Sequence, residues 1–142
     1  MRRMPWGLVL SVLILGAALA SCDGPNRGSN TQPSAVSGFL VTVTASPNTV
    51  RGATAGSGSS DGGCSQIQVV VSKSGQLVDG TLVTVTRTLG VFKSGTQELV
   101  GIQDITIRGV ALFVWCAKSQ RGTAIITATA EDATATVLIT IF

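Results

Sequence analysis

The chain has 142 residues with 10 Lys and Arg, 7 Asp and Glu, no His and no Tyr. The lack of His excludes the usual Ser-His-Asp and Cys-His catalytic pairs and imidazole metal ligands. Because Arg2 and Arg3 belong to a predicted signal peptide, the remainder carries 8 basic and 7 acidic side chains, a balance that does not favour nucleic-acid binding.

The chain begins with a predicted secretory signal. Arg2 and Arg3 form a positive start, and residues 6–20 after them are uncharged and rich in Leu, Val, Ile, Ala and Gly. This apolar run is about 15 residues long, whereas a permanent membrane-spanning helix needs ~20. It ends in Leu-Ala-Ser-Cys at residues 19–22, which resembles the lipobox of bacterial lipoproteins.

The lipobox resemblance implies that the thiol of Cys22 is acylated and that residues 1–21 are removed as a lipoprotein signal peptide. Two or three acyl chains would hold the protein firmly in a membrane, where one chain would be marginal. The alternatives are an ordinary signal peptide cut nearby and an uncleaved membrane anchor. Asp23 resembles the signal that keeps lipoproteins at the inner membrane of enterobacteria, but the choice between inner and outer membrane stays open.

Residues 22–37 are rich in Gly, Pro, Asn and Ser with little to bury, so we interpret them as a flexible tether after the lipidated cysteine. From residue 38 onward, apolar residues alternate with Thr, Ser and Gln in a period of two, which is typical of β-strands. The pattern predicts seven strands, at residues 39–45, 66–71, 81–88, 102–107, 110–117, 123–130 and 134–142.

The Gly- and Ser-rich segment 51–63 predicts a long loop, which is either a simple insertion or a binding site. Residues 91–100 have no clear period, and we expect them to be irregular. Seven short strands without a helix predict an all-β, immunoglobulin-like β-sandwich over residues 38–142, close to the ~100 residues typical of that fold.

Several segments resemble the bacterial immunoglobulin-like domains of the invasin and intimin type. The segment 43–50 is similar to the opening of these domains, and 72–80 followed by Val-Thr-Val at 83–85 is similar to their turn and third strand. Gly-Val-Ala at 109–111 and Gly-Thr-Ala-Ile-Ile-Thr-Ala at 122–128 are similar to two later strands. The resemblance implies a non-catalytic module that serves in cell-surface adhesion.

Cys64 and Cys116 are predicted to form a disulfide. Lipidation of Cys22 leaves these two cysteines, and an exported protein meets an oxidising compartment. In such a sandwich the second and fifth strands are antiparallel neighbours, which brings Cys64 and Cys116 together, both facing outward. Their Cα atoms should then lie ~4.4–6.8 Å apart. The alternative is two unpaired thiols.

The fifth strand has apolar residues on both faces. We expect Phe113 and Trp115 to pack in the core against Ala111, Ala124 and Ala128. Side chains of neighbouring strands should partly cover the outward Leu112 and Val114, and the alternative is a patch for a partner.

Other candidate sites are weak. Glu131 and Asp132 are the only adjacent acids and are interpreted as a solvated turn rather than a calcium site. The glycine-rich segment 57–63 lacks the Lys and the following helix of a phosphate-binding loop.

The sequence therefore predicts a lipoprotein that is not an enzyme and has no cofactor or metal. Its partners would be the membrane, through the N-terminal lipid, and an unidentified protein or surface ligand, with no nucleic acid. The alternative function is a structural envelope protein or a subunit of a larger envelope assembly.

Overall fold

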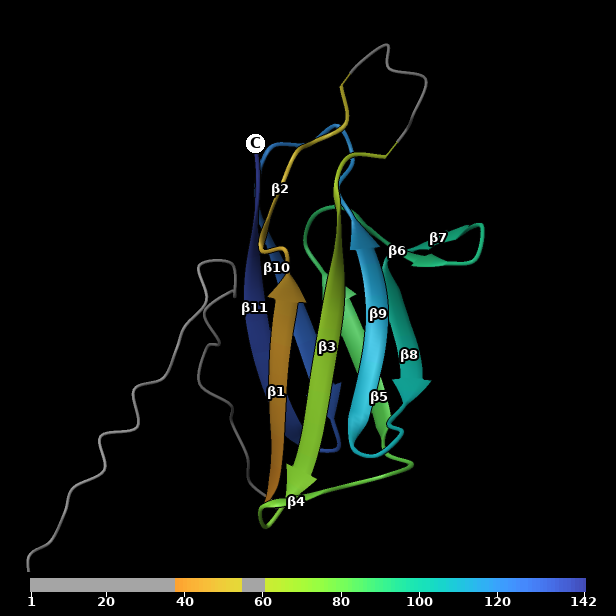
Figure 1. Cartoon of the computed structure of the whole chain (residues 1–142), viewed down its shortest axis with the longest axis vertical. Coiled ribbons are helices and arrows are strands. Elements are labelled where there is room, and N and C mark those ends of the chain that lie inside the picture. Colours follow the sequence, from red (N-terminus) through yellow and green to blue (C-terminus); the bar gives the residue numbers. More distant parts are fainter. Residues whose placement is uncertain (1–37, 55–60) are drawn as a thin grey trace, which may run out of the picture.

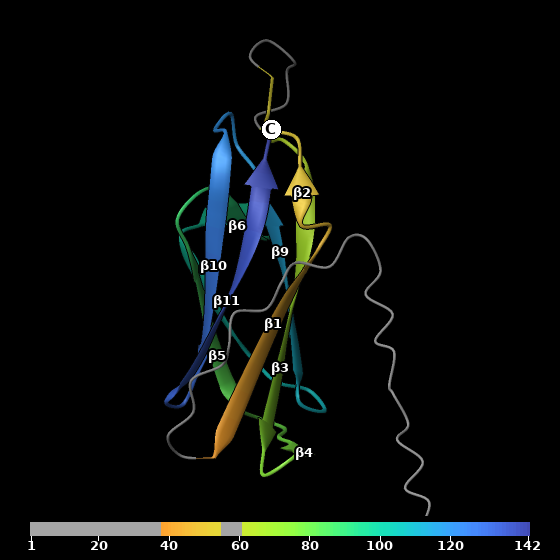
Figure 2. The ribbon, with the colours of Figure 1, turned by 90° about the vertical axis from the view of Figure 1, so that its left-hand side faces the viewer.

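The structure, a computed structural model, describes residues 38–54 and 61–142. This part of the chain forms strands, turns and loops without a helix, so it contains no helix that could span a membrane. The predicted signal peptide, Cys22, the tether and the middle of the 51–63 loop lie outside the described residues. The strands form two sheets that pack face to face, so the predicted all-β fold is confirmed (Figures 1 and 2).

The first sheet, called here the β3–β9 sheet, has the order β1-β3-β9-β6-β7, with the short β4 also paired to β3. All of its pairings are antiparallel. Its strands are β1 (Phe39–Ser46), β3 (Cys64–Lys73), β4 (Gln76–Leu77), β6 (Val91–Ser94), β7 (Gln97–Leu99) and β9 (Val110–Cys116).

The second sheet, called here the β10–β11 sheet, has the order β2-β11-β10-β5-β8. The short β2 runs parallel to the end of β11, and the other pairs are antiparallel. Its strands are β2 (Thr49–Val50), β5 (Leu82–Arg87), β8 (Gly101–Ile105), β10 (Gly122–Ala130) and β11 (Ala133–Ile141).

Each of the seven predicted strands is present, with ends that differ by a few residues. The prediction that residues 91–100 are irregular is wrong, because they contain the β6–β7 hairpin. The hairpin is hidden in the sequence because Val91 and Phe92 are both buried, which breaks the period of two. Its turn contains Gly95, whose φ of 59° is in the left-handed region that glycine adopts easily.

The core lies between the two sheets and follows the predicted parity. Phe113 and Trp115 from β9 are 3% and 0% exposed. Ala124 and Ala128 from β10 are fully buried, as is Phe92 from β6. Small residues on one sheet thus leave room for large rings on the other, as close packing requires.

The outward face of β9 is more exposed than we expected. Leu112 and Val114 are 53% and 46% exposed. Leu112 lies opposite Gln68, and Val114 lies between Gln66 and Lys93, so their neighbours on this face are polar.

The two ends of the sandwich differ in charge. We call the end where β1 begins at Phe39 the base, and the opposite end, where β9 and β11 end, the tip (Figure 1). Strand direction and register place five described Lys and Arg and two described acids toward the tip, a side-chain balance of +3. These residues are Arg51, Arg87, Lys93, Lys118, Arg121, Asp61 and Glu98. The base half has Lys73 and Arg108 against Asp79, Asp104, Glu131 and Asp132, a balance of −2.

Candidate functional site

A disulfide joins Cys64, the first residue of β3, to Cys116, the last residue of β9. The two residues are directly opposite each other in the antiparallel register. The predicted pairing and strand neighbourhood are therefore present in the structure. Their Cα atoms are 4.0 Å apart, slightly closer than the expected range and close to the ~4.5 Å typical of a non-hydrogen-bonded antiparallel pair.

The two half-cystines, which the sequence pattern places on the outward face of the sheet, differ in exposure. Cys64 is exposed, but Cys116 is only 3% exposed. Cys116 lies between two strands, opposite Cys64 on β3 and Val91 on β6. The β6–β7 hairpin, which the sequence pattern did not indicate, explains this burial.

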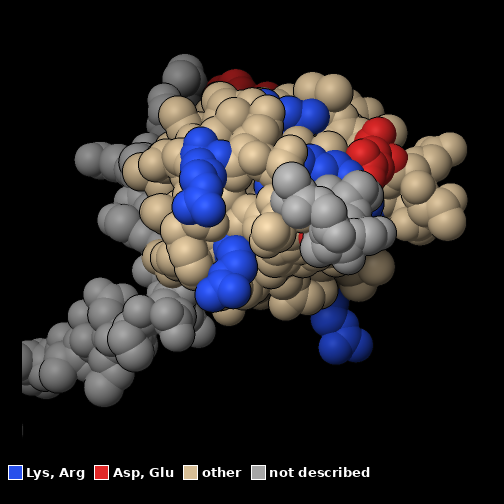
Figure 3. All heavy atoms as spheres, turned by 90° about the horizontal axis from the view of Figure 1, so that it is seen from above, with Lys and Arg blue, Asp and Glu red and all other residues tan. Residues whose placement is uncertain are grey.

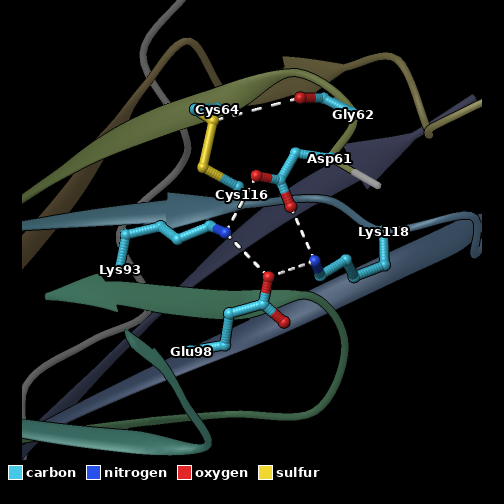
Figure 4. Close-up of a disulfide and its surroundings, with 7 residues drawn as sticks. All are labelled: Asp61, Gly62, Cys64, Lys93, Glu98, Cys116 and Lys118. Atoms are coloured by element: carbon cyan, nitrogen blue, oxygen red, sulfur yellow. Dashed lines mark hydrogen bonds and ion pairs between the residues drawn. A yellow bond between two sulfur atoms is a disulfide. The ribbon is translucent and has the colours of Figure 1, made fainter. Parts of the chain in front are cut away.

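Four charged side chains form an ion-pair cluster beside the disulfide (Figure 4). The Lys118 ammonium lies 2.6 Å from one Asp61 carboxylate oxygen, and the Lys93 ammonium lies 2.8 Å from the other. Both lysines also bind the same Glu98 oxygen. The cluster therefore connects the segment before β3, the β6–β7 hairpin and the segment after β9.

Each charge in the cluster favours the ionised form of its partners. Hydrogen bonds from Lys118, and next from Lys93, lower the pKa of Asp61 and of Glu98 below their ordinary values of 3.8 and 4.5. Hydrogen bonds to Asp61, and next to Glu98, raise the pKa of both lysines above 10.5. The four groups are thus charged across the neutral range and cancel one another, which fits a structural connection rather than a proton-transfer site.

Sequence reasoning missed this cluster. Asp61 lies in a glycine-rich loop, and Lys118 is 57 residues away from it. Only the fold of the hairpin and the disulfide bring the two together, so no spacing in the sequence indicates the contact.

An open hollow of about 530 Å³ lies at the tip. Its lining residues are Arg51, Gly52, Ala53, Thr54, Ser119, Arg121 and Phe142. Two hydrogen bonds fix its wall: the Gly52 N–H donates to the Phe142 carbonyl at 3.0 Å, and the Ala53 N–H donates to the Lys118 carbonyl at 3.0 Å. A side chain at Gly52 would place its Cβ 2.9 Å from the Gln120 carbonyl oxygen, so this close approach requires glycine.

The hollow combines charge with an aromatic ring. The Arg51 guanidinium lies over the Phe142 ring, 5.7 Å from its centroid. Neither Arg51 nor Arg121 has a carboxylate partner among the described residues. Figure 3, which views the tip end-on, shows Lys and Arg groups across this face and acidic groups toward its margins.

The two other candidate sites from the sequence are the acidic pair at residues 131–132 and the glycine-rich segment 57–63. Glu131 and Asp132 form the exposed turn between β10 and β11, with Glu131 at a φ of 54°. In residues 38–54 and 61–142, no group of three or more Cys, Asp or Glu side chains is arranged to hold a metal ion. Of the segment 57–63, only residues 61–63 are described, and they lead into β3.

No protein-family model matches the chain, and no curated protein is similar to it.

Proposed function

We propose that this protein is an exported, lipid-anchored lipoprotein that displays a non-catalytic immunoglobulin-like domain for interaction or adhesion at the cell surface. Cys22 carries the lipid in this proposal, and residues 38–142 form the displayed domain.

The observation that carries the proposal is the disulfide. It uses Cys64 and Cys116, so of the chain's three cysteines only Cys22 is left for lipidation. Structural disulfides form in exported proteins and are rare in the cytosol. The bond therefore supports export, and export is what a signal peptide before Cys22 requires.

The strand order supports the immunoglobulin-like assignment. Immunoglobulin domains place strands A, B, E and D in one sheet and C, F and G in the other. With β1, β3, β9 and β6 as A, B, E and D, and β5, β10 and β11 as C, F and G, both sheet orders agree. Two features depart from antibody domains: β8 pairs with β5 after the β6–β7 hairpin, and the disulfide lies within one sheet.

The non-catalytic assignment follows from the chemistry available. Asp61 and Glu98 are neutralised by two lysines, and Glu131 and Asp132 lie in one exposed turn away from the other acids of the base, Asp79 and Asp104. Without His, the chain lacks the imidazole base of the usual Ser-His-Asp and Cys-His pairs.

The experiment that tests the proposal measures whether the protein incorporates a labelled fatty acid. Cells that express the full chain are fed an alkyne-labelled fatty acid, and the protein is recovered from membrane and soluble fractions. We expect label on the wild type in the membrane fraction and its loss in Cys22→Ala. Ser21→Ala, which keeps a small residue before the cut, is the matched control and should keep the label. Label that persists in Cys22→Ala would contradict the proposal.

A structural role in a larger envelope assembly is the second candidate, favoured by the exposed aliphatic side chains. Ile105, Ile107 and Leu112 are 53–70% exposed and line a small hollow between β8 and β9. Chemical cross-linking on intact cells separates the candidates, because one abundant envelope partner indicates assembly, whereas an external ligand indicates adhesion.

A further inference from the structure

The hollow at the tip is lined by two cationic side chains, Arg51 and Arg121, that form no ion pair with the described part of the chain. The Lys93 and Lys118 charges are satisfied by Asp61 and Glu98. The Arg51 guanidinium lies over the Phe142 ring, and neither Arg51 nor Arg121 forms an ion pair with a described residue. The net positive charge of the tip is therefore presented mainly by the guanidinium groups that line the hollow.

The shape of the hollow suits a small ring-shaped group. Its volume of about 530 Å³ lies within the range of ~300–1,000 Å³ that is usual for ligand pockets. Ser119, a hydroxyl-bearing residue, is among the residues that line it. Phe142 is 49% exposed, which leaves apolar ring surface available beside Arg51.

These groups together match the chemistry of a sugar acid. A guanidinium binds a carboxylate through two parallel hydrogen bonds, which gives both charge and direction. Hydroxyl groups exchange hydrogen bonds with sugar hydroxyls, and the apolar face of a pyranose ring packs on an aromatic ring. We propose that this hollow binds a carboxylate-bearing sugar unit of an acidic polysaccharide, an inference that rests on the proposed display function and names its ligand class.

The hollow lies at the end of the domain opposite to the start of β1. The nine residues of β11 alone span about 30 Å at ~3.3 Å per residue. The hollow is thus about 30 Å from the end of the domain at which β1 begins.

The test uses the detergent-solubilised full chain and oligomers of polygalacturonate as the probe, with neutral dextran as the reference polymer. Affinities are measured by calorimetry or by chromatography on immobilised polymer. We expect wild type to bind polygalacturonate and not dextran, with weaker binding at higher salt. Arg51→Ala and Arg121→Ala should each weaken binding about tenfold or more, because each removes a charge-assisted hydrogen-bond donor.

Arg108→Ala is the matched control, because it removes the same charge at the base. It should bind like wild type, and so should Arg87→Ala, which lies outside the lining of the hollow. An equal loss in Arg108→Ala would show diffuse charge attraction and overturn the proposal. Equal binding to dextran would also overturn it. So would tighter binding to phosphatidylglycerol vesicles by protein whose own lipid has been removed.

Failure of this inference is distinguishable from failure of the proposed function. Polymer binding is measured on solubilised protein and does not depend on acylation, whereas the fatty-acid label does not depend on the arginines. If the wild type carries the fatty-acid label but does not bind polygalacturonate, the proposed lipid anchor stands and the proposed ligand class is wrong.

Discussion

At the residue scale, Gly90 is a position where the fold has no room for a side chain. Its φ is 77°, and an added Cβ would lie 2.3 Å from the Trp115 ring. The indole N–H of that Trp115 donates to the Leu89 carbonyl at 2.9 Å, which fixes the ring beside Gly90. The backbone here can therefore neither accept a methyl group nor move away from it without breaking this hydrogen bond.

Gly90→Ala is expected to lower the free energy of unfolding by about 2–4 kcal/mol, through backbone strain and overpacking together. Gly95→Ala is the matched control, because its φ is also positive, at 59°, but no atom lies within 4 Å of the added Cβ. It should cost only about 1 kcal/mol, from the backbone alone. Urea unfolding of both variants measures the difference, and equal losses would contradict the packing argument.

The disulfide is the second residue-scale feature with a measurable contribution. It closes a loop of 52 residues, for which chain entropy gives about 4 kcal/mol as an upper value. Reduction of the wild type should lower the Tm by many degrees. The double variant Cys64→Ser with Cys116→Ser should melt near the reduced wild type, and reductant should not change its Tm. A wild-type Tm that reductant leaves unchanged, although both thiols are shown to be free, would refute this role.

At the element scale, the alternation along β9 was the most informative part of the sequence. It predicted correctly that Phe113 and Trp115 face the core, because one side of a strand must be buried in a sandwich. It did not predict how exposed Leu112 and Val114 are, because exposure depends on the neighbouring strands. The local β6–β7 hairpin was missed because Val91 and Phe92 are both buried, which breaks the period of two. The ion-pair cluster could not be predicted, since it depends on a contact between segments 57 residues apart.

The two faces of β9 can be compared directly. Phe113→Ala should cost about 3–5 kcal/mol because it leaves a cavity between the sheets. Leu112→Ala, one residue away on the exposed face, should cost less than about 1 kcal/mol. Chemical unfolding of the two variants gives both values, and similar losses would mean that the strand register is wrong.

The ion-pair cluster should make stability depend on pH at both extremes. The pKa values of Asp61 and Glu98 are lowered in the folded protein, so their contribution is present above their ordinary values of 3.8 and 4.5 and is lost as the pH falls through the folded values. The pKa values of Lys93 and Lys118 are raised, so their contribution is present below 10.5 and is lost as the pH rises through the folded values.

Asp61→Asn should therefore be less stable than wild type at pH 7, and the difference should shrink as the pH approaches 3. Glu131→Gln, at an exposed turn of the base, is the control and should follow the wild-type curve. The measurement is the Tm of each variant as a function of pH. A difference between wild type and Asp61→Asn that stays constant down to pH 3 would show that the lost stability does not come from the charge of Asp61.

At the scale of the whole molecule, the chain combines a predicted membrane anchor with two sheets whose tip is cross-linked by a disulfide. That tip, opposite to the start of β1, also carries the positively charged face. Strand β1 begins at the base, and the strands separate the base from the tip. The tip carries the arginine-lined hollow. The pattern of short alternating strands predicted the all-β fold, but the opposite charges of its two ends became visible only once strand direction was known.

The central claim is that the protein is exported, acylated at Cys22 and closed by one disulfide, and the intact mass of the full-length gene product purified from membranes tests it most directly. The account predicts the mass of residues 22–142 plus that of two or three acyl chains, and a rise of about 2 Da on reduction, as two thiols replace the disulfide. An unmodified N-terminus at another residue, or a mass that reduction does not change, would contradict it.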